Sequence, residues 1–332
     1  MHPFALERPR DLSAALALGA QSGRNDAPAE YIAGGTDMVQ LLQEYVRRPD
    51  RLVSLAGLLD DSIDVGPQGL RLGAAATMAE VAAHLGVVEQ FPLISEALLN
   101  SASPQVRNQA TMGGNLLQRT RCPYFRDVAF AACNKRIPGS GCAALDAENR
   151  WHAVLGTSDN CIAVHPSDLA VALVALDAAV EIRGADGNRS VPLSELHRLP
   201  GDTPHLETVL GPGEVIAAIT VPANAAGLRS YYLKVRDRAS FEFAVVSAAV
   251  AIDVADGRIR QARVALGGVG TKPWRVPAAE AALSGSSLDP AALRSAAALA
   301  ANGARGRGRN DFKIELMQRA IVRAAEIAGA RA

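Results

Sequence analysis

Two kinds of apolar pattern alternate along the chain. Alanine-rich stretches with apolar residues at helical spacing predict helices, at 11–20, 77–85, 93–100, 166–177 and 289–302. Short runs of Val, Ile and Leu ending in Gly or Asp predict strands and turns, at 30–38, 69–74, 179–183 and within 231–266. Because these elements do not follow a strict strand-helix-strand order, they predict an α+β fold rather than a doubly wound parallel sheet.

Shifts in composition predict how the chain divides. Pro and Gly crowd residues 199–213, a strand closes at 221–224, and the chain is alanine-rich and helical from 277 onward. We therefore predict three parts with bounds at 1–57, 58–225 and 226–332.

Charge and hydropathy exclude several kinds of partner. Lys plus Arg and Asp plus Glu both count 34, so no net field attracts nucleic acid, and partners must be recognised by shape. The Arg-Gly repeat at 305–309 lacks aromatic neighbours and predicts a loop before the last helix rather than an RNA site. No apolar run approaches the roughly 20 residues of a membrane span. The apolar segment 12–20 resembles a signal peptide, but Asp11 as N-cap and the nearby Glu7 favour a helix.

Two glycine loops are candidates for ligand binding. Residues 31–37 form an apolar strand leading into Gly34-Gly35-Thr36-Asp37, followed by a helical stretch at 38–45, and residues 111–115 contain Gly113-Gly114-Asn115. Glycines let a backbone approach phosphate oxygens, although a structural turn is as good an interpretation of either loop alone. Neither loop has the third glycine of a dinucleotide fingerprint. The glycine-rich segment 267–272 lacks the order of a phosphate loop and predicts a turn.

All four cysteines lie within one forty-residue stretch, at Cys122, Cys133, Cys142 and Cys161. From their spacing alone, a zinc site, two disulfides and an iron–sulfur cluster stay open, although no closely spaced Cys-x-x-Cys pair of the usual zinc kind is present. Nearby cations at 119, 121, 126, 135 and 136 could offset thiolate charge, meet an acidic partner or form a solvated face.

Four segments together resemble a known family. They are Ala33–Asp37 (AGGTD), Gln109–Leu116 (QATMGGNL), His165–Ala170 (HPSDLA) and Tyr232–Arg238 (YLKVRDR). This combination resembles the FAD-binding subunits of molybdenum hydroxylases, the xanthine dehydrogenase and aldehyde oxidase family. The resemblance implies a vanillyl-alcohol-oxidase-type fold of two FAD-binding subdomains, followed by a C-terminal α+β domain of the CO dehydrogenase flavoprotein type.

The resemblance also implies which residues bind FAD. Tyr31, Ile32, Ala33, Gly34, Gly35, Thr36, Asp37 and Met38 would wrap the pyrophosphate, and Thr111, Gly114 and Asn115 would hold phosphate and ribose from the other side. Asp168 would contact the cofactor, Ile216 would touch the isoalloxazine or adenine, and Lys234 would lie near the flavin. No catalytic side chain is implied, because the flavin itself performs the redox chemistry.

The cysteine segment is an insertion in this family pattern. Ser167 lies 52 positions after Asn115, whereas the corresponding residues follow closely in most family members. The insertion, at about 116–165, resembles that of periplasmic aldehyde oxidoreductases, whose FAD subunit carries an extra [4Fe-4S] cluster. A related cluster occurs in the flavoprotein of 4-hydroxybenzoyl-CoA reductase. The resemblance thus implies that Cys122, Cys133, Cys142 and Cys161 bind a [4Fe-4S] cluster, and leaves His152 and His165 as non-ligands.

These implications lead to a functional expectation. The chain would take electrons from [2Fe-2S] clusters on a small partner subunit, after oxidation of an aldehyde at a molybdenum cofactor on a large partner subunit, and pass them to an external acceptor. Alternatives are a medium subunit of the xanthine dehydrogenase or hydroxybenzoyl-CoA reductase type, a stand-alone FAD-linked oxidase and a zinc-stapled binding protein. The resemblance implies a periplasmic location by co-export with a partner, with a cytoplasmic location as the alternative.

Overall fold

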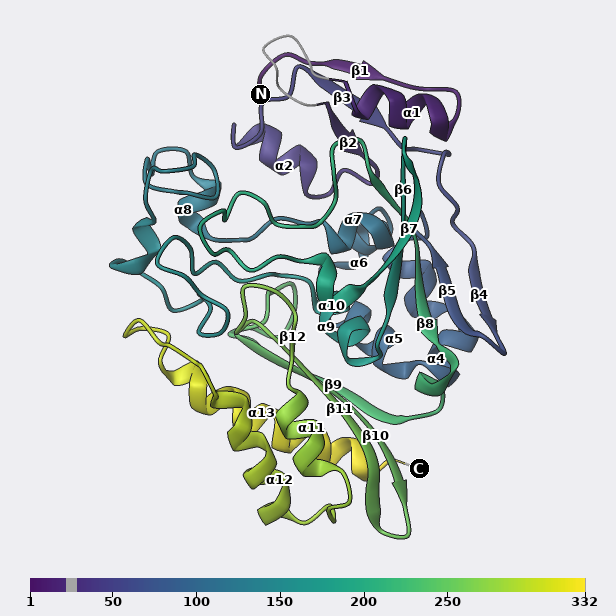
Figure 1. Cartoon of the computed structure of the whole chain (residues 1–332), viewed down its shortest axis with the longest axis vertical. Coiled ribbons are helices and arrows are strands. Elements are labelled where there is room, and N and C mark those ends of the chain that lie inside the picture. Colours follow the sequence, from purple (N-terminus) through teal and green to yellow (C-terminus); the bar gives the residue numbers. More distant parts are fainter. Residues whose placement is uncertain (22–28, 332) are drawn as a thin grey trace.

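Three β-sheets follow one another along the chain in the computed structural model, which describes residues 1–21 and 29–331 (Figure 1). The first sheet has the order β1-β3-β2 and is parallel; its strands are β1 (Ala5–Glu7), β2 (Glu30–Ile32) and β3 (Arg51–Ser54). The second is antiparallel with the order β4-β5-β8-β6-β7; its strands are β4 (Ile63–Gly66), β5 (Gly69–Gly73), β6 (Ala179–Gly184), β7 (Gly187–Pro192) and β8 (Val215–Pro222).

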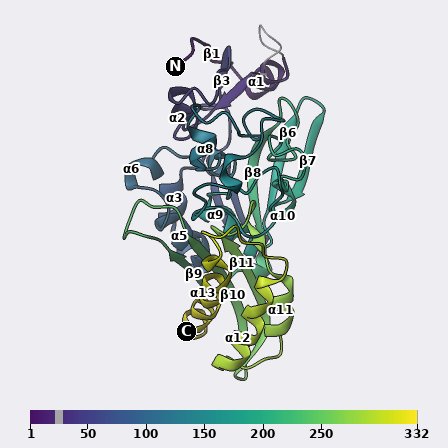
Figure 2. The same ribbon diagram turned by 90° about the vertical axis from the view of Figure 1, so that its left-hand side faces the viewer.

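The third sheet is also antiparallel and has the order β12-β11-β10-β9. Its strands are β9 (Arg229–Val235), β10 (Val246–Ala255), β11 (Arg258–Gly267) and β12 (Trp274–Arg275). Helices α11 (Pro277–Leu283), α12 (Pro290–Ala298) and α13 (Phe312–Gly329) pack together beside this sheet (Figure 2). Helix α9 (Asp168–Ala175) contacts β10 and β11 and so joins this sheet to the middle of the molecule.

The remaining helices lie in the first two parts of the chain. They are α1 (Leu12–Gly19), α2 (Met38–Gln43), α3 (Met78–Ala83), α4 (Leu85–Gln90), α5 (Pro92–Leu99), α6 (Pro104–Arg107), α7 (Met112–Leu116), α8 (Pro123–Arg126) and α10 (Leu193–Leu196). Short 3₁₀ turns lie at Ala143–Leu145 and Ala223–Ala225 in these parts and at Leu299–Ala301 in the third part. Asp11 caps α1 as predicted, because its carboxylate accepts a hydrogen bond from the backbone N–H of Ala14 at 2.8 Å. Mixed helices and strands in this order confirm the α+β prediction.

The strand and turn predicted over 30–38 are observed, since β2 ends at Ile32 and the chain turns at the paired glycines before α2 begins. Some helix bounds differ from the predicted ones. The helix predicted over 77–85 stops at Ala83, because His84 is extended and α4 starts a new helix. The segment 267–272 is a turn, as predicted, with Gly268 at φ +72°.

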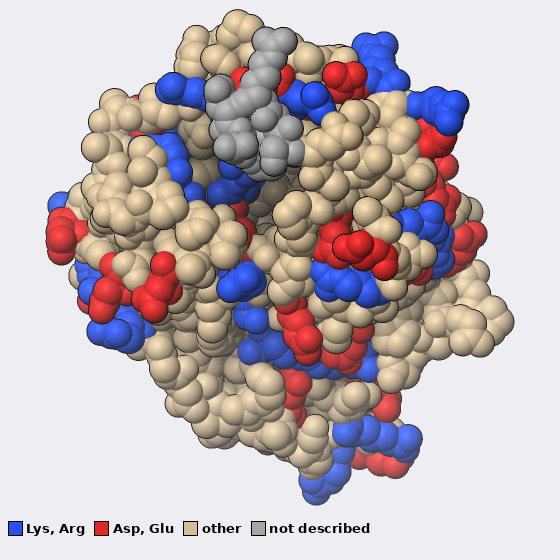
Figure 3. Space-filling view, turned by 45° about the horizontal axis from the view of Figure 1, so that its top comes forward, with Lys and Arg blue, Asp and Glu red and all other residues tan. Residues whose placement is uncertain are grey.

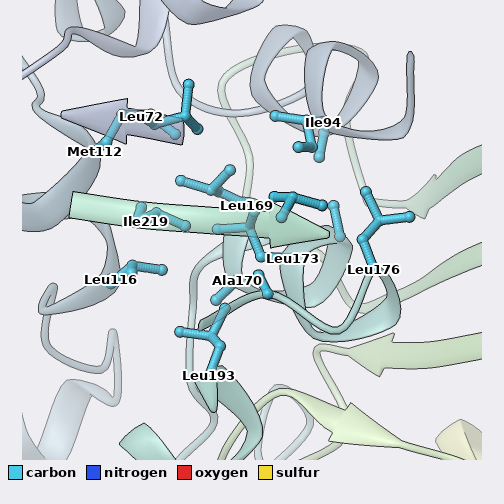
Figure 4. Packing of buried hydrophobic residues seen from close by; sticks show 14 of the residues in the cluster. Leu72, Ile94, Met112, Leu116, Leu169, Ala170, Leu173, Leu176, Leu193 and Ile219 are labelled. Atoms are coloured by element: carbon cyan, nitrogen blue, oxygen red, sulfur yellow. The ribbon is translucent and has the colours of Figure 1, made fainter. Parts of the chain in front are cut away.

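Helix α9 occupies the centre of the largest core. All eight of its residues are buried, and an apolar surface on every side is typical of a helix enclosed by other elements. Leu169 and Leu173 of α9 lie among Leu72 of β5, Ile219 of β8 and Ile94 of α5 (Figure 4). Burial of each such side chain contributes about 1.5–3 kcal/mol, so α9 holds its first residue, Asp168, in a fixed position.

The inserted segment at 116–165 is mostly irregular and contains α8 and one 3₁₀ turn. It lies to one side of the molecule between the first and third sheets (Figure 1). The Arg-Gly loop before α13 contacts it, since the Arg305 N–H donates to Val154 O at 2.7 Å and the Arg307 guanidinium pairs with Asp159 at 2.7 Å. Over the described ranges, every helix is too short or too polar to cross a bilayer.

Candidate flavin site and cysteine cavity

A cavity of about 990 Å³ opens between the first two sheets and the start of the third. This volume is at the upper end of the range of small-molecule and cofactor sites. The cavity is lined by all the residues that the family resemblance implies for FAD binding. They are Tyr31, Ile32, Ala33, Gly34, Gly35, Thr36, Asp37, Met38, Thr111, Gly114, Asn115, Asp168, Ile216 and Lys234. Positive and negative side chains are intermingled on the face shown in Figure 3, as expected for a chain without net charge.

The first glycine loop packs directly against the approach to the second. A Cβ atom on Gly34 would lie 1.9 Å from the backbone oxygen of Gln109, so no larger residue fits there. Gly35 has φ +73°, a left-handed conformation that favours glycine. These two glycines allow the loops at 33–37 and 109–115 to meet and form one wall of the cavity.

The second glycine loop is joined to the segment that follows the insertion. The Thr111 hydroxyl accepts a hydrogen bond from the Gly114 N–H at 3.2 Å and caps α7. The buried Asn115 side chain accepts a 2.5 Å hydrogen bond from the Ser167 hydroxyl, which also caps α9. The two ends of the insertion are therefore held together at the cavity wall.

Asp168 and Lys234 form a buried ion pair at this wall. The Lys234 ammonium lies 2.8 Å from Asp168 Oδ2, and their side chains are only 2 % and 5 % exposed. Asp168 also accepts hydrogen bonds from Ser101 Oγ at 2.7 Å and from the Tyr232 hydroxyl at 2.6 Å. Burial, together with the negative charge of Asp168, raises the pKa of Tyr232 well above its ordinary value. Tyr232 is thus a neutral donor, and the carboxylate is fully hydrogen-bonded.

Asp37 connects the first glycine loop to the start of the insertion. Its carboxylate accepts hydrogen bonds from the Arg119 N–H at 2.7 Å, from Arg121 at 2.6 Å and from Arg126 at 2.7 Å. Burial alone would raise the pKa of Asp37, but the two guanidinium groups and the Arg119 N–H together lower it below its usual value. This carboxylate is committed to arginines and does not provide a free acceptor at the cavity.

Several insertion cations are buried, so a solvated face is the wrong interpretation for them. The side chains of Arg119, Arg126 and Lys135 are only 14 %, 10 % and 10 % exposed. Glu207 pairs with both Arg119 and Lys135, at 2.6 Å from the Lys135 ammonium. The loop before β8 is thereby fixed to the insertion through charges.

Tyr31 and Ile216 also make contacts that stabilise the wall of the large cavity. The Tyr31 hydroxyl donates to Gly213 O at 2.9 Å, and burial raises its pKa to about 12. Ile216 is 2 % exposed and lies at the irregularity where β8 pairs with β6. Both residues line the cavity together with the first glycine loop.

The four cysteines line one small second cavity, of about 10 Å³. All four sulfurs are free thiols, so the structure contradicts two disulfides. Backbone bridges bring Cys133 opposite Cys142 and Ser158 opposite Cys161. Burial raises the pKa of Cys122 to about 12 and that of Cys161 to about 11. Burial therefore favours the neutral thiols, and a bound metal would supply the positive charge that stabilises thiolates.

The arrangement of the four cysteines limits which metal group the small cavity can hold. Within residues 1–21 and 29–331, no three His, Cys, Asp or Glu side chains are close enough together to hold a single ion. A zinc ion needs four ligands at about 2.0–2.3 Å, so a zinc site does not fit this arrangement. An iron–sulfur cube spreads its four cysteine ligands over separate iron atoms. Four cysteines around one cavity match that set of ligands.

Two cavities share part of one wall. Lys135, Cys161 and Ala163 border both the cysteine cavity and the large cavity. The Ala163 N–H is 3.5 Å from Cys161 Sγ and donates toward it. Whatever the two cavities hold is therefore separated by little more than these side chains.

His152 and His165 are both close to the sites. His152 Nε2 lies 3.1 Å from Cys122 Sγ, and burial, followed by the charge of Lys313, lowers the pKa of His152 to about 4. His165 packs edge-on against His197 with ring centroids 4.2 Å apart, on the wall of the large cavity. Burial lowers the pKa of His165 well below its usual value, so both rings are neutral.

Most partners of Asp168 and of the insertion cations carry no signal in the sequence pattern. Ser101 and Tyr232 bind Asp168, and Glu207 binds two insertion cations. Tyr232 was part of a matching segment, which gave a usable signal. Ser101 and Glu207 lie in stretches without a distinctive pattern, and only the folded chain brings them to the site.

Comparisons with known proteins agree with this geometry. Residues 2–224 match the FAD binding domain in molybdopterin dehydrogenase, and residues 231–328 match the CO dehydrogenase flavoprotein C-terminal domain. The aldehyde oxidoreductase FAD-binding subunit PaoB of Escherichia coli (strain K12) is 51 % identical over 267 residues, covering 80 % of this chain and 82 % of that protein. The carbon monoxide dehydrogenase medium chain of Afipia carboxidovorans is 26 % identical over 99 % of this chain and 98 % of its own length.

A solved structure shows the same fold. Reconstituted CO dehydrogenase from Oligotropha carboxidovorans superposes with a TM-score of 0.77 at 25 % identity, covering all of both chains. The flavoprotein class therefore comes from fold, cavity and family matches together. The chain belongs to the FAD-binding medium subunits of the molybdenum hydroxylase family.

Proposed function

We propose that this chain is the FAD-binding electron-transfer subunit of a molybdenum-dependent aldehyde oxidoreductase. The observation that carries the proposal is the large cavity, where both glycine loops and the buried Asp168–Lys234 pair meet. The aldehyde assignment rests on the 51 % identity to an aldehyde oxidoreductase FAD-binding subunit. More distant relatives include a carbon monoxide dehydrogenase medium chain and a nicotine 6-hydroxylase medium subunit, which makes another enzyme of this family the second candidate.

In this proposal the glycine loops bind FAD. The backbone of 31–38 lies against the pyrophosphate, Thr111, Gly114 and Asn115 hold phosphate and ribose, and Asp168, Ile216 and Lys234 border the rest of the cofactor. FAD supplies the redox chemistry when bound. The side chains bind it, orient it and exclude water. The Asp168–Lys234 pair keeps a charged group at the wall without leaving it unpaired.

We further propose that Cys122, Cys133, Cys142 and Cys161 bind a [4Fe-4S] cluster. Support comes from four free thiols around one cavity and from the poor fit to a single zinc ion. Backbone N–H groups near the sulfurs, such as that of Ala163 near Cys161, are typical partners of cluster sulfurs. Lys135 adds a positive charge at the same wall.

The partners in this proposal are a large subunit with the molybdenum cofactor and a small subunit with [2Fe-2S] clusters. Electrons would pass from the [2Fe-2S] clusters to FAD and then to an external acceptor. We propose a periplasmic location by co-export with a partner. Cell fractionation with and without the partner subunits tests the location, and accumulation in the cytoplasm of cells that make the whole complex would contradict it.

Spectroscopy and reduction of the co-expressed complex test the function. The purified complex should show flavin absorption bands with a broad iron–sulfur shoulder, and an aldehyde should bleach the flavin without oxygen. The isolated chain should bind FAD but not be reduced by aldehyde. Direct reduction of the isolated chain would favour a stand-alone oxidase. Reduction of the complex by a purine or an N-heterocycle but by no aldehyde would favour the second candidate.

A further inference from the structure

His152 contacts the cysteine cavity although it is not one of the four expected ligands. Its Nε2 atom lies 3.1 Å from Cys122 Sγ, and the residue is 3 % exposed. The other ring nitrogen, Nδ1, is buried without a hydrogen-bond partner in the described part of the chain. The contact with sulfur is therefore the polar interaction that this ring makes.

The C-terminal part of the chain holds this histidine in place. The fully buried Asn310, in the loop before α13, donates to His152 O at 3.4 Å and to Ala153 O at 3.0 Å. The ring also lies against Tyr124 of α8, with centroids 6.0 Å apart. Asn310 fixes the backbone at His152 and Tyr124 borders the ring, so the approach of the ring to Cys122 is preorganised.

The chemistry of an iron-bound cysteine decides the direction of this hydrogen bond. A metal-bound thiolate has no proton to donate, whereas a neutral imidazole carries one N–H. Nε2 must then carry the proton and donate it to sulfur. Hydrogen bonds to cluster sulfurs are among the factors that set the reduction potential, because a donor stabilises the more negative, reduced state.

We propose that His152 is a positioning residue that donates a hydrogen bond to the Cys122 sulfur and raises the reduction potential of the cluster. This inference rests on the proposed [4Fe-4S] cluster. The equilibrium concerned is the uptake of one electron by the cluster, with no covalent bond formed or broken in the protein. His152 acts through Cys122 and does not itself bind iron.

Two substitutions separate this role from a purely structural one. His152→Phe keeps the bulk of the ring and removes the donor, whereas His152→Gln keeps a donor. His2→Phe, at an exposed residue near Asp50, is the control for loss of a histidine elsewhere. Each variant is purified within the complex, analysed for iron, sulfide and flavin, and titrated electrochemically with the cluster followed by electron paramagnetic resonance.

We expect His152→Phe to retain iron, sulfide and flavin and to hold the electron about tenfold less tightly, a fall of about 59 mV in potential for one electron. His152→Gln should recover part of this fall, and His2→Phe should match the wild type. In the wild type, an exchangeable N–H proton should couple to the reduced cluster, and this measurement needs no variant.

Other outcomes overturn the inference in distinguishable ways. An unchanged potential in His152→Phe, or no exchangeable coupling in the wild type, would show that the contact does not tune the cluster. Loss of iron from both folded His152 variants would make His152 a ligand instead. Absence of iron and sulfide from the wild-type complex would refute the cluster itself, while the FAD assignment would still be tested by flavin content.

Discussion

Replacement of Lys234 by methionine should strongly destabilise the flavin-free protein. The change removes the ammonium that lies 2.8 Å from Asp168 and leaves a carboxylate only 5 % exposed without its counter-charge. Methionine fills a similar volume, so the loss reports on charge rather than on packing. Removal of one partner from a buried ion pair costs about 3–5 kcal/mol. We expect the lower half of this range, because Ser101 and Tyr232 still donate to the carboxylate.

Denaturant unfolding followed by circular dichroism measures this loss. Arg319→Met is the matched control, since its partner Glu315 is in an exposed pair with side chains 73 % and 70 % exposed, where an ion pair contributes roughly 0.3–0.5 kcal/mol. Asp168→Asn in the Lys234→Met background should recover much of the stability, because it removes the unpaired charge. A loss below about 1 kcal/mol for Lys234→Met, or no recovery in the double variant, would refute the reasoning.

Three further predictions concern the two glycine loops, the four cysteines and the pH dependence of stability at Asp37. Gly35→Val should greatly reduce flavin content, and Asn115→Ala should also weaken flavin binding. Gly257→Val is the control, because it imposes the same left-handed strain at a residue that does not line the cavity, and it should keep its flavin. Full flavin content in both loop variants would contradict the site. Serine at any one of the four cysteines should remove close to four iron and four sulfide per chain and spare flavin, whereas bound zinc would reject the cluster. Asp37→Asn should destabilise the protein at neutral pH, and the gap to the wild type should close as pH falls below 3.8 toward the lowered folded-state pKa; a gap that does not change with pH would exclude the charge of Asp37 as its cause.

Sequence patterns were sufficient where local information decides the structure. The alanine-rich periodic stretch at 166–177 predicted the helix observed as α9, and Asp11 before an apolar stretch predicted the start of α1. The glycine loops were recognisable because Gly34 and Gly35 meet steric demands that other residues cannot meet.

Long-range pairings were not predictable in the same way. Asp37 lies in the glycine loop expected to wrap the pyrophosphate, yet its carboxylate binds arginines more than eighty positions away. The sequence leaves His152 as a non-ligand of the cluster, and nothing local indicates its contact with Cys122 or its backbone hydrogen bond from Asn310, 158 positions further along the chain. Such contacts depend on how separate parts of the chain pack, and no local pattern encodes them.

The hydrogen bond between Asn115 and Ser167 closes the insertion at its base. The chain leaves the flavin wall after Asn115 and returns to it at Ser167, 2.5 Å away between side-chain oxygens. The ends of the insertion are held together, and the entropic cost of closing a loop rises only slowly with the length of the loop. Residues of the insertion that neither line the large cavity nor bind Asp37 or Glu207 can therefore change in number or kind without moving either end of the wall. A flavoprotein built in this way can alter its metal-binding segment during evolution as long as the charged contacts to Asp37 and Glu207 are kept.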